Sequence, residues 1–308
     1  KGGADHYNEV IVRVLEDGWG KAKIGSHVVR NNTIFACEQA GICGSMGAAF
    51  SEVTGNHIYD VWTKRLFSGA EIAGIKFHGA IDTLIKNNRI HNVGRGIWMD
   101  WMTQGTRLSA NLCYDNDRED LFSEVNHGPY LVDNNIFLSP RGIMTWSEGG
   151  AYVHNLIAGK MVMRPVKERS TPVHTAHSTE LAGIKNIAAG DERFYNNIFV
   201  AGFAENPADG KYTNMGKPDY GLAVFDAAEL PMFVAGNVYL NGARPSSADT
   251  EYVELPDVDP QLKVVEQDGR VLLHLTLNES CLGQNTKLVT TQTLGRARIP
   301  NLPYDNPD

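Results

Sequence analysis

Asn134-Asn135-Ile136-Phe137 is one copy of a short phrase that recurs along the first two thirds of the chain. Each copy holds an Asn that follows a turn-forming residue, most often Asn or Gly, and precedes a short apolar run. These residues are Asn32, Asn56, Asn88, Asn111, Asn135, Asn155, Asn197 and Asn237. Successive copies are 24, 32, 23, 24, 20, 42 and 40 residues apart. The series indicates a repeat of about 20–24 residues with insertions, in which two steps are double-length or carry a loop.

A second phrase precedes the Asn of five units by 13 to 15 residues. Its copies are Gly41-Ile42, Gly74-Ile75, Gly96-Ile97, Leu121-Phe122 and Gly142-Ile143. Each unit therefore holds short β-rich runs between Gly and Asn turns, without a long helical pattern. Such units predict an all-β fold, a right-handed parallel β-helix (solenoid) in which the repeated Asn side chains bond one another along the axis. A β-sandwich with Asn-rich turns is the alternative.

The repeat divides the chain into two parts. Residues 1–242 are predicted to form β-helix rungs that carry the functional face, because the Asn237 phrase is the last clear copy. Residues 243–308 begin with Pro-containing, acidic segments and are predicted to form a tail or cap that packs on the helix. Residues 1–21 do not resemble a solenoid cap. We therefore expect earlier rungs on an N-terminal segment or on another chain of the same protein, a homo-oligomer included.

Composition limits the classes of partner. The formal net charge is −8, whereas nucleic acids and anionic membranes bind clustered Lys and Arg, so neither is expected as a partner. No apolar run approaches the roughly 18 residues of a membrane helix, which favours a cytoplasmic or periplasmic bacterial location over a membrane one. The four cysteines lack zinc-type spacing, and the apolar surroundings of three of them predict inert core thiols.

Two acidic residues occupy the same position in consecutive repeats. Asp100 lies 11 residues before Asn111, and Glu124 lies 11 residues before Asn135. Equivalent positions on neighbouring rungs stack at the interstrand spacing of about 4.8 Å. Retaining glycosidases place their two carboxyl groups about 5–5.5 Å apart, and inverting enzymes leave a wider gap. The register therefore predicts a pair of catalytic carboxylates with a retaining outcome.

Like charges at this spacing raise the pKa of one partner, which suits a general acid beside an anionic nucleophile. Two stacked carboxylates are also compatible with a Ca²⁺ site, and a surface coincidence is the third possibility. The neighbours of the pair favour the catalytic interpretation. Trp98 and Trp101 offer indole faces on which a pyranose ring stacks, and apolar walls raise a carboxyl pKa. If Trp98 instead points into the core, strand alternation places Asp100 there too, unless the strand bends or bulges.

Further candidates for binding sugar hydroxyls lie near the pair in sequence or in register. Asn126 and His127 follow Glu124, although a lone His is more often structural. Glu71 and His78 precede the Asp100 rung, and a solvated loop acid is the alternative for Glu71. Trp146 lies one rung beyond Glu124 and would extend the wall.

The segment 174–180 falls in the long step between Asn155 and Asn197 and is predicted to form a loop over one face. Its His177 and Glu180 are candidates for substrate contacts. The histidines His174 and His177 also suggest metal binding, but no fourth ligand follows them. We therefore predict no metal at this segment.

At these residues the sequence resembles glycoside hydrolase family 120, β-xylosidases built on a right-handed parallel β-helix. The resemblance covers most of residues 27–200. The matching segments are 37–42, 96–107 (GIWMDWMTQGTR), 122–129 (FSEVNHGP), 133–138 and 177–180. It implies that Asp100 is the nucleophile and Glu124 the general acid/base. The family carries a β-sandwich domain inserted in its N-terminal half, so this chain resembles the C-terminal portion.

Three functions compete on this basis. The first is a retaining, exo-acting β-xylosidase that takes terminal β-D-xylosyl units from xylo-oligosaccharides. The second is a Ca²⁺-dependent polysaccharide lyase, which needs a basic residue at the site, and no Arg or Lys adjoins Asp100 or Glu124 in the sequence. The third is a non-catalytic carbohydrate-binding β-helix. We expect a xylo-oligosaccharide as the partner and no cofactor. A structural Ca²⁺ ion is compatible with the two stacked carboxylates.

Overall fold

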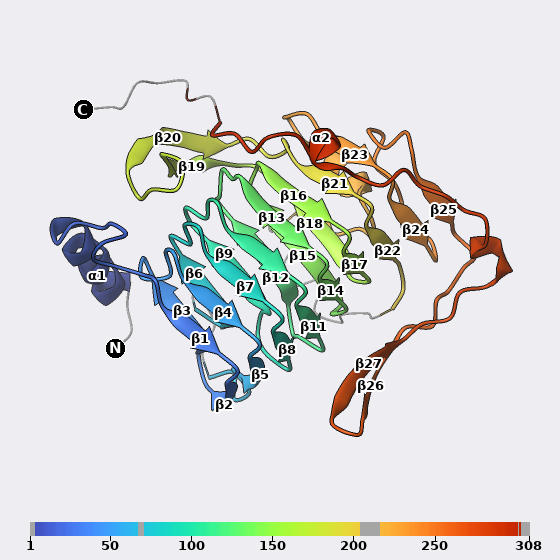
Figure 1. Ribbon diagram of the computed structural model, residues 1–308, viewed down its shortest axis with the longest axis horizontal. Helices are drawn as coiled ribbons and strands as arrows, with labels where there is room; N and C mark the ends of the chain where they lie inside the picture. The colour runs from blue at the N-terminus through green and yellow to red at the C-terminus, as the bar shows by residue number, and fades with distance from the viewer. Residues whose placement is uncertain (1–3, 67–70, 204–215, 301, 303–308) are drawn as a thin grey trace.

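The computed structural model describes residues 4–66, 71–203, 216–300 and 302. The chain winds into successive rungs, and each full rung adds one strand to each of three parallel sheets (Figure 1). This arrangement is the right-handed parallel β-helix that the repeat predicted, and the protein is all-β. The described residues outside the stack also form α1 (Ala4–Glu16), α2 (Thr291–Leu294) and the 3-10 turns η3 (Ala223–Ala227) and η4 (Glu279–Cys281).

The three sheets, called A, B and C, follow one another around each rung. Sheet A contains β1 (Val28–Arg30), β4 (Glu52–Thr54), β7 (Leu84–Lys86), β10 (Arg107–Ser109), β13 (Tyr130–Asp133), β16 (Gly150–Val153), β21 (Arg193–Tyr195) and β23 (Phe233–Ala235). Sheet B contains β2 (Thr33–Cys37), β5 (His57–Val61), β8 (Arg89–His91), β11 (Leu112–Tyr114), β14 (Ile136–Phe137), β17 (Leu156–Ile157), β22 (Ile198–Val200), β24 (Val238–Leu240) and β25 (Val253–Leu255). Sheet C contains β3 (Ala40–Ser45), β6 (Ala73–His78), β9 (Ile97–Asp100), β12 (Glu119–Glu124), β15 (Arg141–Trp146) and β18 (Lys160–Met163).

The repeated Asn forms a continuous hydrogen-bonded ladder at the turn between sheets A and B. The residue before each Asn has a positive φ, for example 56° at Asn134, which explains the preference for Asn and Gly there. Each Asn Nδ2 donates to Oδ1 of the next Asn at 2.9–3.0 Å, from Asn32 to Asn237. The predicted axial bonding of stacked amides is therefore confirmed.

Replacing Asn135 with alanine is expected to destabilise the protein by about 3 kcal/mol or more, because buried polar groups without partners cost about 1–3 kcal/mol each. The Asn135 amide donates to Asn155 and to the Leu108 carbonyl, and it accepts from both the backbone and the side chain of Asn111. Urea unfolding measures the loss. Asn134→Gly is the matched control, since glycine accepts the positive φ and leaves the ladder intact. Equal stability of the two variants would contradict the ladder's role.

Strand alternation sorts the residues of sheet C into an inner and an outer row. The inner row is a buried apolar stack inside the helix: Ile75, Ile97, Leu121, Ile143 and Met161. These residues include most copies of the second phrase, so that phrase marks the core. The outer row of the same strands carries the polar residues of interest.

The long step between Asn155 and Asn197 contains a β-hairpin that lies along the stack (Figure 1). It consists of β19 (Val166–His174) and β20 (Leu181–Ile187), which pair antiparallel. The segment 174–180 forms the turn end of this hairpin, as the loop prediction required. The hairpin passes over the side of the stack that carries sheet C.

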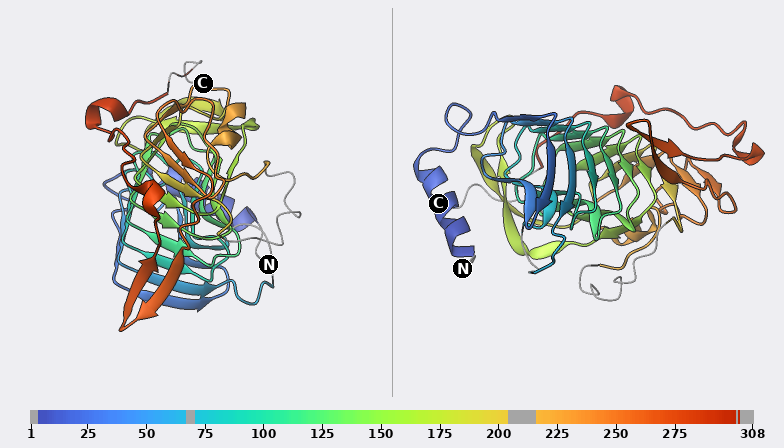
Figure 2. Two further views of the ribbon diagram at one scale, coloured as in Figure 1. Left: turned by 90° about the vertical axis from the view of Figure 1, so that its right-hand side faces the viewer. Right: turned by 90° about the horizontal axis from the view of Figure 1, so that it is seen from below.

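Both ends of the chain differ from the expectations in detail. Sheet B continues past residue 242 through β25. The antiparallel hairpin of β26 (Lys263–Gln267) and β27 (Arg270–His274) returns toward earlier strands of sheet B, where its apolar side chains join a cluster with Tyr114 and Glu266 pairs with Arg89 (Figure 1). The division at residue 242 remains a prediction. At the other end, α1 stands beside the first rung (Figure 2), an element that we did not predict although Tyr7, Val10, Val14 and their neighbours have helical spacing.

The cysteines agree only in part with the expected core thiols. All four are free, and Cys113 is buried. Cys43 is exposed on the outer row of sheet C, where its thiol contacts a carboxylate oxygen of Glu71 at 3.5 Å. Only one of the four thiols is therefore fully in the core.

Candidate active site

One outer row of sheet C brings the predicted carboxylates together. The strand register pairs His78 with Asp100, Asp100 with Glu124, and Glu124 with Trp146 on four consecutive rungs. The pairing that the 11-residue spacing predicted is therefore present. The backbones of paired strands lie about 4.8 Å apart, so the two carboxylates are direct neighbours on one face.

Asp100 is held by two nitrogen donors on one of its oxygens. Its Oδ2 accepts from Lys76 Nζ at 2.8 Å and contacts His78 Nε2 at 2.9 Å. Its Oδ1 is buried and has no hydrogen-bond partner among the described residues. Burial acts to raise the pKa of Asp100, but the hydrogen bond from His78 and the charge of Lys76 outweigh it and lower the pKa. Asp100 is therefore a carboxylate with one oxygen bound and one free.

Glu124 has the opposite electrostatic character. Its Oε2 accepts from Trp98 Nε1 at 3.0 Å, and its Oε1 accepts from Arg169 of β19 at 3.0 Å. Burial and, next to it, the charge of Asp100 raise the pKa of Glu124 to about 7. At neutral pH this carboxyl group is thus available in both its protonated and ionised forms, beside a neighbour that stays ionised.

The tryptophans show how the strand is oriented. Trp98 and Asp100 both point outward, because their neighbours Ile97 and Met99 belong to the inner core. The interpretation with Trp98 in the core is therefore wrong, and neither a bend nor a bulge is required. Trp98 is buried on the outer face, where its ring contacts Lys76 and its indole N–H reaches Glu124.

Two other tryptophans lie at the edges of the row. Trp101 approaches His78 edge-on, with ring centroids 6.5 Å apart. Trp146 is half-buried, and the guanidinium of Arg164 lies 4.6 Å above its ring. Both remain candidates for stacking against a sugar.

Glu71 and His78 join the site through Lys76, which the sequence analysis missed. Lys76 is fully buried and lies 3.4 Å from a Glu71 oxygen and within 3.2 Å of the His78 ring. Together with Arg169 beside Glu124, it corrects the inference that no basic residue adjoins the pair. Lys76 stands 24 residues before Asp100, one repeat away, so the register held a signal for its rung. Arg169 had no such signal, because it comes from the hairpin.

Asn126 and His127 lie in the turn after β12 and serve the fold. The Asn126 amide is fully buried and bonds to the Met99 carbonyl and to Ser123, while its oxygen accepts from the Thr103 amide. His127 contacts Glu148 and carbonyls of the hairpin. Both side chains are buried and hold these bonds within the protein, and their contacts with substrate remain a prediction.

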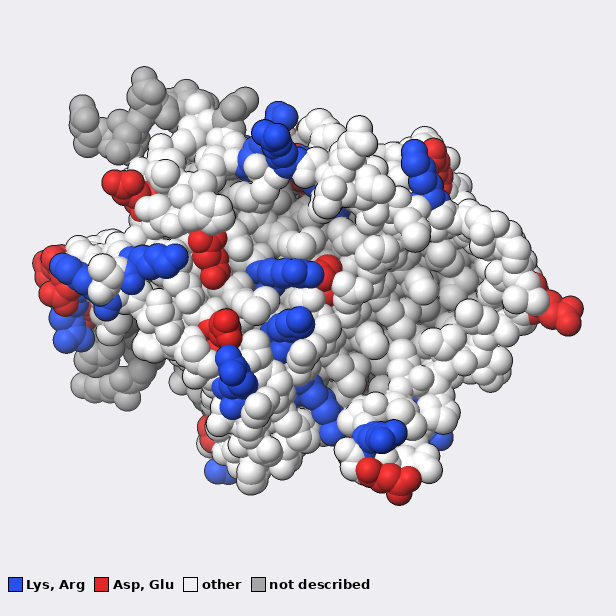
Figure 3. Space-filling view, in the orientation of Figure 1, with Lys and Arg blue, Asp and Glu red and all other residues white. Residues whose placement is uncertain are grey.

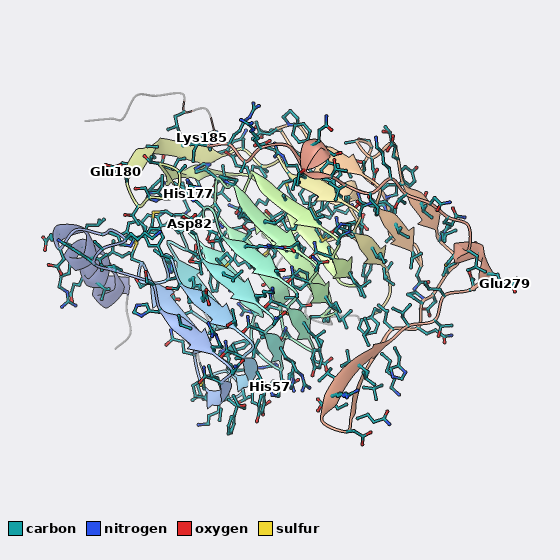
Figure 4. The ribbon with its side chains drawn as sticks, viewed as in Figure 1. His57, Asp82, His177, Glu180, Lys185 and Glu279 are labelled. Atoms are coloured by element: carbon teal, nitrogen blue, oxygen red, sulfur yellow. The ribbon has the colours of Figure 1, made fainter. Side chains whose placement is uncertain are left out.

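His177 and Glu180 lie at the turn of the β19–β20 hairpin (Figure 4). His177 is largely exposed, and its Nδ1 contacts Asp82 at 2.9 Å. Glu180 is exposed as well. The structure places both residues outside the Asp100–Glu124 row, with His177 among the hairpin's attachments, and their contacts with substrate remain a prediction.

The charges on the surface bear on the expectation that neither nucleic acid nor an anionic membrane is a partner. On the face shown in Figure 3, Lys and Arg side chains are interspersed with Asp and Glu among the residues drawn in colour. Within the described part of the chain, no helix is long and apolar enough to span a membrane. No group of three or more His, Cys, Asp or Glu side chains there is arranged to hold a metal ion.

Comparison with known proteins supports this fold. The family described as "Right handed beta helix region" matches residues 21–157. A solved structure described as "The complex structure of XylC with xylose" is similar, with a TM-score of 0.83 and 43% sequence identity. The similarity covers 97% of this chain and 49% of the XylC chain, so this chain spans about half of that protein. Among curated proteins, none matches the chain significantly. The chain therefore has a right-handed parallel β-helix, as its motifs predicted, and it is similar to about half of the XylC chain.

Proposed function

We propose that this chain carries the catalytic face of a retaining, exo-acting β-xylosidase that removes terminal β-D-xylosyl units from xylo-oligosaccharides. The observation that carries the proposal is the register-matched pair of Asp100 and Glu124. The pKa of Asp100 is lowered and that of Glu124 is raised to about 7. Such a divergence between neighbouring carboxyl groups is the pattern of an assigned nucleophile and acid. The similarity to a protein solved with xylose supports the choice of sugar.

The geometry suggests how the two steps proceed. Lys76 and His78 hold the Asp100 carboxylate in its ionised form, and one of its oxygens attacks the anomeric carbon. Protonated Glu124 gives its proton to the glycosidic oxygen as the bond to the leaving sugar breaks. Ionised Glu124 then takes a proton from water, and the water oxygen attacks the anomeric carbon and releases Asp100. Two inversions leave the anomeric configuration unchanged.

The competing functions fit these contacts less well. A Ca²⁺ ion at the pair would be repelled by Lys76 against Asp100 and by Arg169 against Glu124. The proton abstraction of a lyase needs a base that touches substrate, whereas the Lys76 side chain is wholly buried and the partly exposed Arg169 is held in an ion pair with Glu124. A purely binding surface gives no reason for two neighbouring carboxyl groups with divergent pKa values.

The anomer that is first released tests the proposal. We expect proton NMR during hydrolysis of an aryl β-xyloside to show β-xylose first, followed by mutarotation. An unsaturated uronate product from a uronate polymer would instead establish the lyase. Initial release of α-xylose would exclude the retaining mechanism.

A further inference from the structure

The β19–β20 hairpin is attached to the stack at its turn end by several specific contacts. Gln104, in the turn after β9, donates to the His174 carbonyl at 2.8 Å and accepts from the His174 amide at 3.1 Å. His177 contacts Asp82, as Figure 4 shows for the labelled side chains. The hydroxyl of Thr179 donates to a backbone carbonyl of the segment before β1. The turn end is thus fixed to the first rungs.

Two buried residues on the next rungs attach the middle of the same hairpin. His127 Nε2 lies 3.2 Å from the Thr171 carbonyl of β19 and 2.9 Å from the Lys185 carbonyl of β20. Glu148 accepts from Lys185 Nζ at 2.7 Å and from the Ala188 amide at 3.0 Å, and it also contacts His127. Gln104, His127 and Glu148 follow sheet C on three consecutive rungs. The hairpin is therefore fixed along the length of the catalytic row.

A bulge in the attached hairpin directs one side chain at Glu124. The register of β19 against β20 shifts between Val166 and Ser170, so residues 167–169 have no partners in the ladder. Bulges of this kind redirect side chains and are common beside active sites. Arg169 lies in the bulge, and its guanidinium contacts Glu124 Oε1 at 3.0 Å. Its side chain is 46% exposed, so it reaches the row from the solvent side.

The charges that face Glu124 come from several elements. Asp100 on β9 is the paired anion, and its charge is, next to burial, the main cause that raises the pKa of Glu124. Arg169 on β19 comes first among the groups that lower this pKa, followed by Arg95, which precedes β9, and Lys76 on β6. Arg95 and Lys76 already have carboxylate partners, in Glu119 and in Asp100. Arg169 is therefore the cation in direct contact with Glu124.

We propose that the hairpin is a positioning element that holds Arg169 against Glu124 and thereby sets the protonation of the general acid. Arg169 is a positioning residue in this scheme, since it acts through Glu124. The inference rests on the proposed function of that residue. This role explains why the long insertion between Asn155 and Asn197 lies beside the site. It also explains why buried residues on three successive rungs bind one hairpin.

The test is the titration of Glu124 in the Arg169→Met variant of the whole chain. Loss of a contacting cation is expected to raise the pKa of Glu124 by about 0.5–1 unit, since an adjacent opposite charge lowers a carboxyl pKa by about 1–3 units and this one is partly screened. Carbon-13 NMR of protein labelled at the glutamate carboxyl carbon measures the titration, with the Glu124 signal assigned by its absence in Glu124→Gln. The alkaline limb of the pH profile of kcat/KM should move to higher pH by the same amount. Arg169→Lys, which supplies a cation again, should return the pKa of Glu124 most of the way to the wild-type value.

Lys167→Met is the matched control, because it removes a cation from the same strand that pairs with Glu229 and not with Glu124. It should leave the titration unchanged. Lys185→Met, which removes one of the hairpin's contacts to Glu148, should move the Glu124 titration in the same direction as Arg169→Met and by less. A titration of Glu124 that is the same in wild type and Arg169→Met overturns the inference, even where kcat falls. A shifted titration in a protein that cleaves no xyloside supports the positioning role and rejects the proposed function instead.

Discussion

Replacing Asp100 with alanine is expected to reduce the rate of hydrolysis of an aryl β-xyloside by about four orders of magnitude or more. This loss exceeds the roughly 10²–10⁴-fold rate contribution of a typical general acid or base. The reason is that the Asp100 carboxylate forms the covalent intermediate in the proposed mechanism, and Glu124, the other carboxyl group of the pair, already serves as the acid. Azide in the alanine variant should occupy the vacated space and attack the anomeric carbon from the same side. The product would then be the α-xylosyl azide, which NMR identifies.

A loss of activity is informative only when the protein remains folded. Asp100 pairs with the buried Lys76, so its removal leaves a buried charge without its carboxylate. Asp100→Asn retains the shape and one acceptor oxygen, and it should be equally inactive. Glu52→Ala is a control elsewhere on the helix, since Glu52 lies on sheet A and pairs with the exposed Arg30. Wild-type activity in both Asp100 variants would reject the assignment.

The fold was predictable because β-helix rungs are local in sequence and repeat their turn chemistry. The spacing of Asn111 and Asn135 was enough to pair Asp100 with Glu124, since the Asn ladder fixes each rung against the next. His78 and Trp146 lie 10 and 9 residues before Asn88 and Asn155, so the 11-residue spacing alone does not place them, although the strands pair them with Asp100 and Glu124. The Asp100–Glu124 pairing is predictable because one residue of slippage would break the ladder and expose the inner apolar row.

The candidates whose contacts the sequence did not predict lie where the repeat gives no register. Asn126 and His127 follow the last paired residue of β12, and their bonds go to turns and to the hairpin. His177 and Glu180 lie in the insertion itself, whose path over the stack is fixed by contacts with Gln104 and Glu148. Arg169 was missed for the same reason. Contacts made by an insertion depend on tertiary packing, which composition and spacing do not encode.

The two carboxyl groups also differ in how far their chemistry could be anticipated. Adjacency alone predicted that one pKa would be raised, but it did not say which one. The structure decides this through neighbours that are remote in sequence. Lys76 and His78 lie on the Asp100 side of the row, whereas Glu124 has a neutral indole donor and one partly exposed cation. The roles that the family resemblance implied therefore agree with the electrostatics of the site.

Replacing Glu124 with alanine is expected to slow cleavage of xylobiose by about 10²–10⁴-fold, the usual contribution of a general acid. An aryl xyloside with a very acidic leaving group needs no protonation, so formation of its glycosyl-enzyme should be almost unaffected. The second step should then become rate-limiting, because no base activates water, and a burst of released phenol should appear. This dependence on the leaving group separates a lost acid from a disrupted fold, which would slow both substrates alike.

Azide completes the distinction between the two carboxyl groups. In Glu124→Ala it should attack the glycosyl-enzyme from the side that water uses and restore turnover, giving the β-xylosyl azide. This product has the opposite configuration to that expected from Asp100→Ala. In the wild type, activity should fall as the pH rises through about 7, because Glu124 has a raised pKa and must be protonated for the first step. The alkaline limb should disappear in Glu124→Ala for the substrate with the acidic leaving group. If the alanine variant cleaves both substrates with equal losses and gives no azide product, Glu124 is not the acid.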